Sequence, residues 1–180
     1  SQVTAVGGET QVNTVTDSTQ KHPAVAMAQD GSYTIVWESL GQSGDADRFG
    51  IFQRRYSADG TPLSTGVVNS LTAGNQRYPD IAMAQNGAYV VFWMDDTKDD
   101  NTWSIQGRRF DNTGAALGDI FPLIENGTQA KFPKVSVQDN GDMVVVFAQI
   151  DTSTNTFSIR SRRITAAGVN VEAVQTVATS

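Results

Sequence analysis

Apolar and polar residues alternate in short stretches, and the same pattern of stretches occurs three times along the chain. Each copy runs from a proline through a short apolar strand, a two-residue turn signal and a second apolar strand that ends in an aromatic residue. The copies are Pro23–Trp37, Pro79–Trp93 and Pro133–Phe147. Asp-Gly or Asn-Gly between two apolar runs is a strong hairpin signal. Because no stretch shows a 3.6-residue apolar period over three turns, we expect β-structure and almost no helix.

An Ile-x-x-Arg-Arg block follows each hairpin and predicts a third strand. The blocks begin at Ile51, Ile105 and Ile159, at a constant interval of 54 residues, and each leads to a turn glycine. A fourth strand is predicted at Gly66–Leu71 and Asp119–Ile124, with one more copy at Thr10–Val15. We therefore divide the chain, as one repeat domain, into an orphan outer strand within residues 1–19 and repeats at 20–75, 76–128 and 129–180. The first repeat differs in length between strands two and three, which predicts loops at Glu38–Arg48, Met94–Asn101 and Ala148–Asn155.

Repeats of four short antiparallel strands at this spacing are typical of β-propeller blades. One such sheet cannot bury both of its faces alone, and stacking it against its copies buries them. We predict an all-β fold of propeller-like blades, with a β-sandwich as the alternative. A closed propeller usually has at least four blades, so the chain is either a piece of a longer ring or one of two copies that complete a ring. Self-association as a dimer is the expectation, although one copy of strand four is then left over.

Composition narrows the class of partner. The net charge of −6 argues against nucleic acid, which selects a basic surface. No apolar run approaches the roughly 18 residues of a membrane span, so we expect no membrane insertion. Cysteine is absent, which excludes disulfides and thiolate metal sites. The single histidine, His22, stands where the sister repeats have Tyr78 and Phe132, which favours a packing role over catalysis.

The repeat resembles one that is common in very large secreted bacterial proteins of the calcium-binding and adhesin type. The likeness covers nearly the whole chain. It rests on Val12-Asn13-Thr14-Val15-Thr16, Gln20, Pro23, Asp30-Gly31, Trp37-Glu38-Ser39, Gly50-Ile51, Arg54-Arg55-Tyr56 and Gly60. The third repeat departs most, since Phe147 replaces the tryptophan and Pro122-Leu123-Ile124 replaces the Val-Asn-Thr box. The resemblance implies a protein that is secreted or at the cell surface, and it carries no catalytic motif.

Two recurring sets of side chains are candidates for ligand binding. The first arginine of each pair, Arg54, Arg108 and Arg162, shares a strand face with the residue after the pair. Such arginines either hold carbonyls or acidic partners across a blade interface or bind acidic sugars and carboxylates. An aromatic residue also recurs at each loop edge, at Phe49, Trp103 and Phe157. If exposed, these side chains offer a flat apolar platform for sugars, and otherwise they cap the core.

Acidic residues gather in the predicted loops, most densely at Asp95, Asp96, Asp99 and Asp100. Carboxylates at short spacing can hold calcium together with carbonyls and waters, or can simply be solvated. No loop matches an EF-hand or a glycine-rich calcium nonapeptide. Calcium is therefore a possible cofactor, with those four aspartates as its ligands.

No recurrent carboxylate pair forms a glycosidase acid and base, so we do not expect an enzyme. The leading interpretation is an extracellular binding or adhesion module that recognises carbohydrate with one weak, lectin-like site per blade. The alternative is a structural spacer or scaffold repeat without a ligand, stabilised by calcium. A weaker alternative is a fragment of a polysaccharide-processing enzyme whose catalytic residues lie outside this chain.

Overall fold

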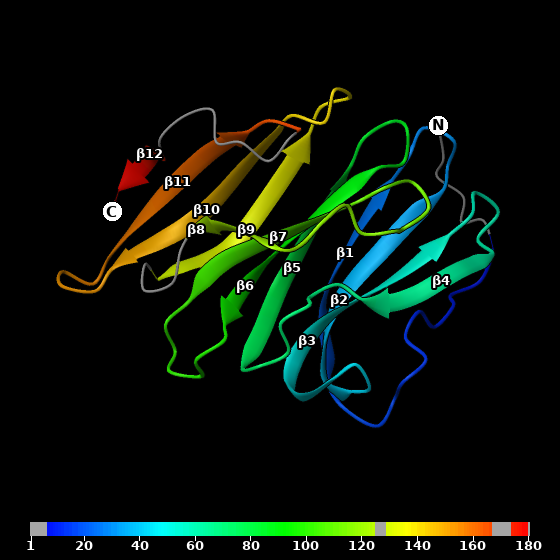
Figure 1. The fold of residues 1–180 in the computed structure, drawn as a ribbon, viewed down its shortest axis with the longest axis horizontal. Coiled ribbons are helices and arrows are strands. Elements are labelled where there is room, and N and C mark those ends of the chain that lie inside the picture. Colours follow the sequence, from blue (N-terminus) through cyan, green and yellow to red (C-terminus); the bar gives the residue numbers. More distant parts are fainter. Residues whose placement is uncertain (1–6, 125–128, 167–173, 180) are drawn as a thin grey trace.

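Twelve β-strands form three four-stranded antiparallel sheets, arranged like the blades of a propeller (Figure 1). The computed structural model describes residues 7–124, 129–166 and 174–179. The first sheet contains β1 (Gln20–Met27), β2 (Tyr33–Gln42), β3 (Asp45–Tyr56) and β4 (Pro62–Val67). The second contains β5 (Asn75–Met83), β6 (Tyr89–Asp96), β7 (Ser104–Phe110) and β8 (Phe121–Ile124). The third contains β9 (Ala130–Val137), β10 (Met143–Asp151), β11 (Thr156–Ile164) and β12 (Gln175–Thr179). The predicted all-β architecture of blade-like sheets is confirmed.

Glycines in left-handed conformations close the first hairpin of every sheet. The φ angles of Gly31, Gly87 and Gly141 lie between 85° and 86°. An L side chain is strained at such angles, which explains why the turn signal recurs with glycine in its second position. In the first sheet the strands then pair from Met27 opposite Tyr33 onwards.

The three sheets fan out from their first strands. Strand β5 contacts both β1 and β9, whereas the fourth strands lie at the outer edges of their sheets. We call the line along which β1, β5 and β9 meet the axial edge. This arrangement brings equivalent residues of the first strands close together although they are far apart in the sequence.

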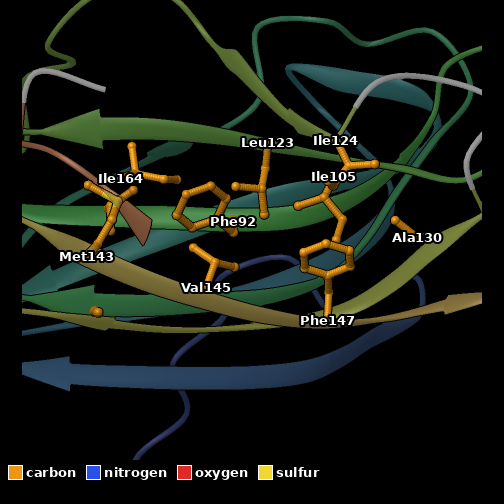
Figure 2. Close-up of a cluster of buried hydrophobic side chains, with 11 residues drawn as sticks. Phe92, Ile105, Leu123, Ile124, Ala130, Met143, Val145, Phe147 and Ile164 are labelled. Carbon is orange, nitrogen blue, oxygen red and sulfur yellow. The ribbon is translucent and has the colours of Figure 1, made fainter. Parts of the chain in front are cut away.

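Two apolar clusters hold the sheets together. The first, between the first and second sheets, includes Val36, Ile51, Val91 and the fully buried Trp93. The second lies between the second and third sheets and includes Phe92, Ile105, Val145 and Phe147 (Figure 2). Burying an aromatic or branched side chain contributes about 1.5–3 kcal/mol, so these clusters are the main source of inter-sheet stability.

The strand predicted at Thr10–Val15 is absent, because residues 7–19 form no strand in the structure. An outer strand needs the third strand of its own sheet as a partner, and the described part of the chain has none at this end. Instead, the Arg54 guanidinium donates a hydrogen bond to the carbonyl of Val12 at 2.7 Å. Several further boundaries differ from the prediction, among them the end of β10 at Asp151, inside the predicted loop Ala148–Asn155. Strand β4 begins and ends about four residues early, and β2 and β3 extend through most of the predicted loop 38–48. Extending a hairpin pairs backbone groups that a loop would leave to solvent.

Candidate functional site

The first arginine of each pair holds a backbone carbonyl outside its own sheet, and in the second and third repeats this contact links neighbouring sheets. Arg108 of β7 donates to the Val68 carbonyl at 2.9 Å, and Arg162 of β11 donates to the Leu123 carbonyl of β8. Together with Arg54 and Val12, this gives one arginine clamp per repeat. These contacts correspond to the interface role considered for Arg54, Arg108 and Arg162. Their use in ligand binding stays a prediction that the geometry does not favour.

The aromatic residues predicted at the loop edges do not come together. Trp103 is only 8% exposed, and its indole N–H donates to Asn101 at 2.8 Å. Its ring face is therefore not a surface platform, because it caps the core of the second sheet. Phe49 is half-buried, with the Arg77 guanidinium 4.6 Å from its ring centroid. Phe157 is 47% exposed at the far end of the third sheet and is the one of the three that still offers an accessible ring.

The four aspartates predicted as calcium ligands serve separate hydrogen bonds. Asp95 and Asp96 are buried, with 1% and 3% of their surface exposed. The side chains of Thr97 and Gln76 donate hydrogen bonds to Asp95. The backbone N–H groups of residues 100 and 101 donate to Asp96. Asp99 pairs with Arg48 and accepts from Asn75, and Asp100 accepts from Thr102 N–H. Among the residues that the structure describes, no three acidic, histidine or cysteine side chains are placed to hold a metal. Calcium binding by this loop stays a prediction without a preformed site.

A row of aromatic side chains lies along the axial edge instead. His22, Tyr78 and Phe132 occupy the same position in β1, β5 and β9, and all three have left-handed φ angles, of 51°, 52° and 56°. Such angles are uncommon for residues other than glycine and are concentrated at functional sites. The His22 and Tyr78 rings lie 4.0 Å apart by their centroids, and Tyr78 and Phe132 lie 4.9 Å apart, edge to face. We call these three residues the aromatic row.

A shallow pocket of about 180 Å³ lies over the aromatic row. Its wall consists of the row itself, the proline that follows each member, and Lys134. Phe132 is 47% exposed, and the Lys134 side chain is 66% exposed while its ammonium group pairs with Asp80 at 3.0 Å. The pocket therefore offers apolar ring faces next to one positively charged donor.

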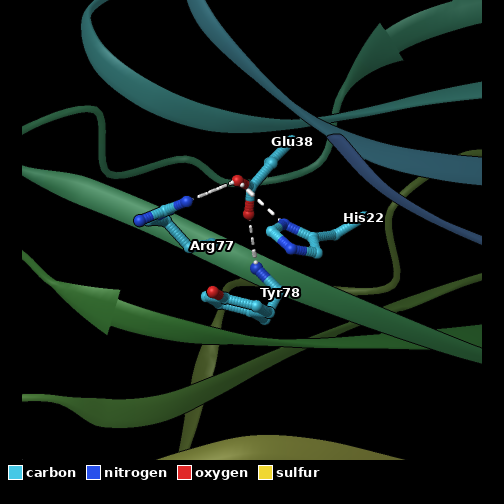
Figure 3. A network of polar contacts seen from close by, with 4 residues as sticks. All are labelled: His22, Glu38, Arg77 and Tyr78. Carbon is cyan, nitrogen blue, oxygen red and sulfur yellow. Dashed lines mark hydrogen bonds and ion pairs between the residues drawn. The ribbon is translucent and has the colours of Figure 1, made fainter. Parts of the chain in front are cut away.

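Glu38 contacts two members of the row, His22 and Tyr78, through a network of polar contacts (Figure 3). Its side chain is fully buried, and its Oε1 accepts hydrogen bonds from Arg77 Nη2 at 2.9 Å and Nε at 3.2 Å. The other oxygen, Oε2, accepts from the Tyr78 backbone N–H at 2.8 Å. His22 Nδ1 lies 3.0 Å from Oε1, which is an ion pair when the imidazole is protonated. One carboxylate thus holds the backbone of Tyr78, lies against His22 and joins the first sheet to the second.

The recurring sequence signal of this site is an aromatic residue followed by proline before each hairpin, with a glutamine two residues before the aromatic residue in the first two repeats and three residues before it in the third. The sequence alone shows that His22, Tyr78 and Phe132 are equivalent, but this equivalence favoured a packing role for His22 and gave no sign of a shared pocket. Glu38 carried no recurrent signal, because Met94 and Ala148 follow the equivalent aromatic residues in the other repeats. The carboxylate is saturated by its cationic and backbone partners, so its geometry is that of an anchor for the row.

The three-sheet fold is shared with carbohydrate-active β-propeller enzymes. A Hadza microbial sialidase superposes with a TM-score of 0.63 at 11% identity, covering 89% of this chain and 37% of its own. An endo-arabinase from Bacteroides thetaiotaomicron gives 0.58 at 13% identity, over 87% of this chain and 61% of its own. An endo-1,4-beta-xylanase from the same organism gives 0.55 at 12% identity, over 86% and 59%. The chain thus spans less than two thirds of the length of each of these proteins.

No protein family and no curated protein matches the sequence. The likeness to solved structures therefore establishes the blade-like fold alone. Within the described ranges, there is no helix with the length and apolar character needed to cross a membrane.

Proposed function

We propose that this protein is a non-enzymatic carbohydrate-binding domain that holds a sugar chain on the aromatic row. The observation that carries the proposal is the recurrence of an aromatic side chain, in a left-handed backbone conformation, on all three first strands around one open pocket. Equivalent binding elements on successive blades suit a polymer of repeating units. Following the resemblance of the sequence, we place the protein at the cell surface or in the secreted fraction.

The chemistry of the row fits a polyhydroxylated ligand. Each ring offers an apolar face for the C–H groups of a pyranose or furanose, and the phenol of Tyr78, the imidazole of His22 and the ammonium of Lys134 can donate hydrogen bonds to hydroxyl or carboxylate oxygens. Contacts of this kind are individually weak, and several engaged along one chain multiply their effect through a high local concentration.

The fold neighbours support this ligand class without defining the sugar. Because these neighbours are a sialidase, an endo-arabinase and an endo-1,4-beta-xylanase by name, sialylated glycans, arabinan and xylan are the first ligands to test. The competing interpretation is a structural spacer without a ligand. It is favoured by the clamp role of Arg54, Arg108 and Arg162, because it engages three of the candidate binding residues in contacts with backbone carbonyls of this chain.

Affinity electrophoresis tests the proposal. The wild-type protein is run in native gels that contain arabinan, xylan or sialylated mucin, beside the variants Phe132→Ala and Leu117→Ala. Both substituted side chains are about half exposed, but Leu117 lies outside the row. We expect retardation by at least one glycan, loss of retardation with Phe132→Ala, and none of this loss with Leu117→Ala. Equal mobility in all gels would favour the spacer, and release of reducing ends from the glycans would contradict a non-enzymatic role.

A further inference from the structure

The outer face of the third sheet exposes residues whose counterparts are buried inside the molecule. Val144, Val146 and Ile159 are 39%, 36% and 43% exposed. The residues 54 positions earlier, Val90, Phe92 and Ile105, are 2%, 0% and 0% exposed because the third sheet covers them. The exposed face of the third sheet is thus equivalent to the apolar face of the second sheet on which the third sheet packs.

The opposite end of the stack shows the complementary face. Val25 and Met27 of the first sheet are 61% and 62% exposed. Their counterparts in the second sheet are Ile81, which is 6% exposed, and Met83, which packs on the cluster between the first two sheets. The exposed face of the first sheet is therefore equivalent to the face of the second sheet that packs on the first sheet.

A cavity marks the place of a missing sheet on this face. It has a volume of about 340 Å³ and is lined by residues that include Val12, Ile35 and Trp37. Trp93, the counterpart of Trp37, packs in a cluster with Val36 and Ile51 of the preceding sheet. No preceding sheet stands before Trp37 among the described residues, and the cavity occupies the region in which its side chains would pack.

The polar contacts between sheets have counterparts at both ends as well. Ile159 pairs with Ala178 in the way that Ile105 pairs with Ile124, so Val177 of β12 corresponds to Leu123. The Leu123 carbonyl is the one that Arg162 holds, and the Val12 carbonyl occupies the equivalent place at Arg54. A third sheet docked on the first would bring the Val177 carbonyl to Arg54.

We propose that the two end faces are the halves of one interface and that a second copy of this chain docks on them head to tail. In each copy, the outer face of the third sheet covers Val25, Met27 and the cavity at Trp37 in the other copy. The Val177 carbonyl of the first copy then accepts the hydrogen bond from Arg54 of the other copy, in place of the Val12 carbonyl. Two copies joined in this way at both ends form a closed six-sheet propeller with two-fold symmetry. A second copy is the occupant that fits, because both internal interfaces are already built from this repeat.

Sedimentation velocity over a range of concentrations tests the proposal, with the variants Val146→Lys, Val25→Lys and Leu117→Lys. All three side chains are exposed, and Leu117 lies in the connection between β7 and β8, where it lines a pocket between the second and third sheets and belongs to neither end face. We expect a wild-type dimer of twice 19.3 kDa. A lysine on either end face should raise the dissociation constant by at least about tenfold, because docking would bury its charge. Leu117→Lys should leave the dimer intact.

Mixing the two end-face variants tests the direction of docking. Each variant keeps one intact face, so an equimolar mixture of Val146→Lys and Val25→Lys should form a dimer through one unaltered interface, with a lower dissociation constant than either variant shows alone. A wild-type monomer at all concentrations would overturn the proposal. A dimer that survives one of the two lysines would also overturn it, since it would indicate pairing of identical faces. Species larger than a dimer would contradict the closed propeller.

Discussion

Replacing Glu38 with glutamine should destabilise the protein far more than the loss of an ordinary acidic residue. The carboxylate is fully buried and accepts three hydrogen bonds, two from Arg77 and one from the Tyr78 backbone. Glutamine keeps one oxygen for Tyr78 but turns an amide N–H₂ towards the guanidinium. Breaking a buried ion pair costs about 3–5 kcal/mol, and because the Arg77 side chain is 25% exposed and can partly rehydrate, we expect about 2–3 kcal/mol.

Urea unfolding followed by tryptophan fluorescence measures this loss, and a thermal scan should show the melting temperature lowered by about 4–12 °C. Asp119→Asn is the matched control, because Asp119 is exposed and its removal should change the free energy of unfolding by less than about 0.5 kcal/mol. If Glu38→Gln were as mild as the control, the carboxylate would not be the link between the first two sheets, and its role in fixing the aromatic row would be refuted.

Substitutions at three further positions probe contacts within and between the sheets. Arg108→Ala should cost about 1–3 kcal/mol in urea unfolding, because it frees the buried Val68 carbonyl, and Arg108→Lys should restore part of the loss. Burial raises the pKa of the Asp95 carboxyl above its ordinary value of 3.8, so this group loses its proton at a lower pH in the unfolded chain than in the folded protein. The free energy of unfolding therefore falls as the pH rises above about 3.8. In thermal scans from about pH 3 to pH 7, the melting temperature of Asp95→Asn should rise relative to that of the wild type. Burial also raises the pKa of Tyr89 to about 12, so stability should fall as the pH rises from about 10, and an ultraviolet titration should lose its latest phase in Tyr89→Phe.

The parts of the fold that repeat could be predicted from the sequence. The Asp-Gly and Asn-Gly turns set the hairpins, and the alternation around Ile51 and its counterparts set the third strands, because both follow from local backbone preferences. The length of the β2–β3 hairpin and the fate of Thr10–Val15 could not be predicted. Both depend on whether a pairing partner is present, which is a property of the tertiary structure.

The candidate site was harder to predict for the same reason. His22, Tyr78 and Phe132 are visible as equivalent positions, but their exposure follows from how the first strands converge at the axial edge. Glu38 gave no signal, since one repeat alone carries it. The position of Trp103 beside a loop left open whether its ring is exposed or caps the core, and the structure buries it, with 8% of the residue exposed.

The central claim is that a glycan binds along the aromatic row. The most direct measurement is an amide chemical-shift titration of the labelled protein with xylohexaose, arabinohexaose and sialyllactose. We predict saturable shifts at His22, Tyr78, Phe132 and Lys134 with at least one of them. Shifts confined to the hairpin end near Phe157, or no saturable shifts with any of the three, would contradict it.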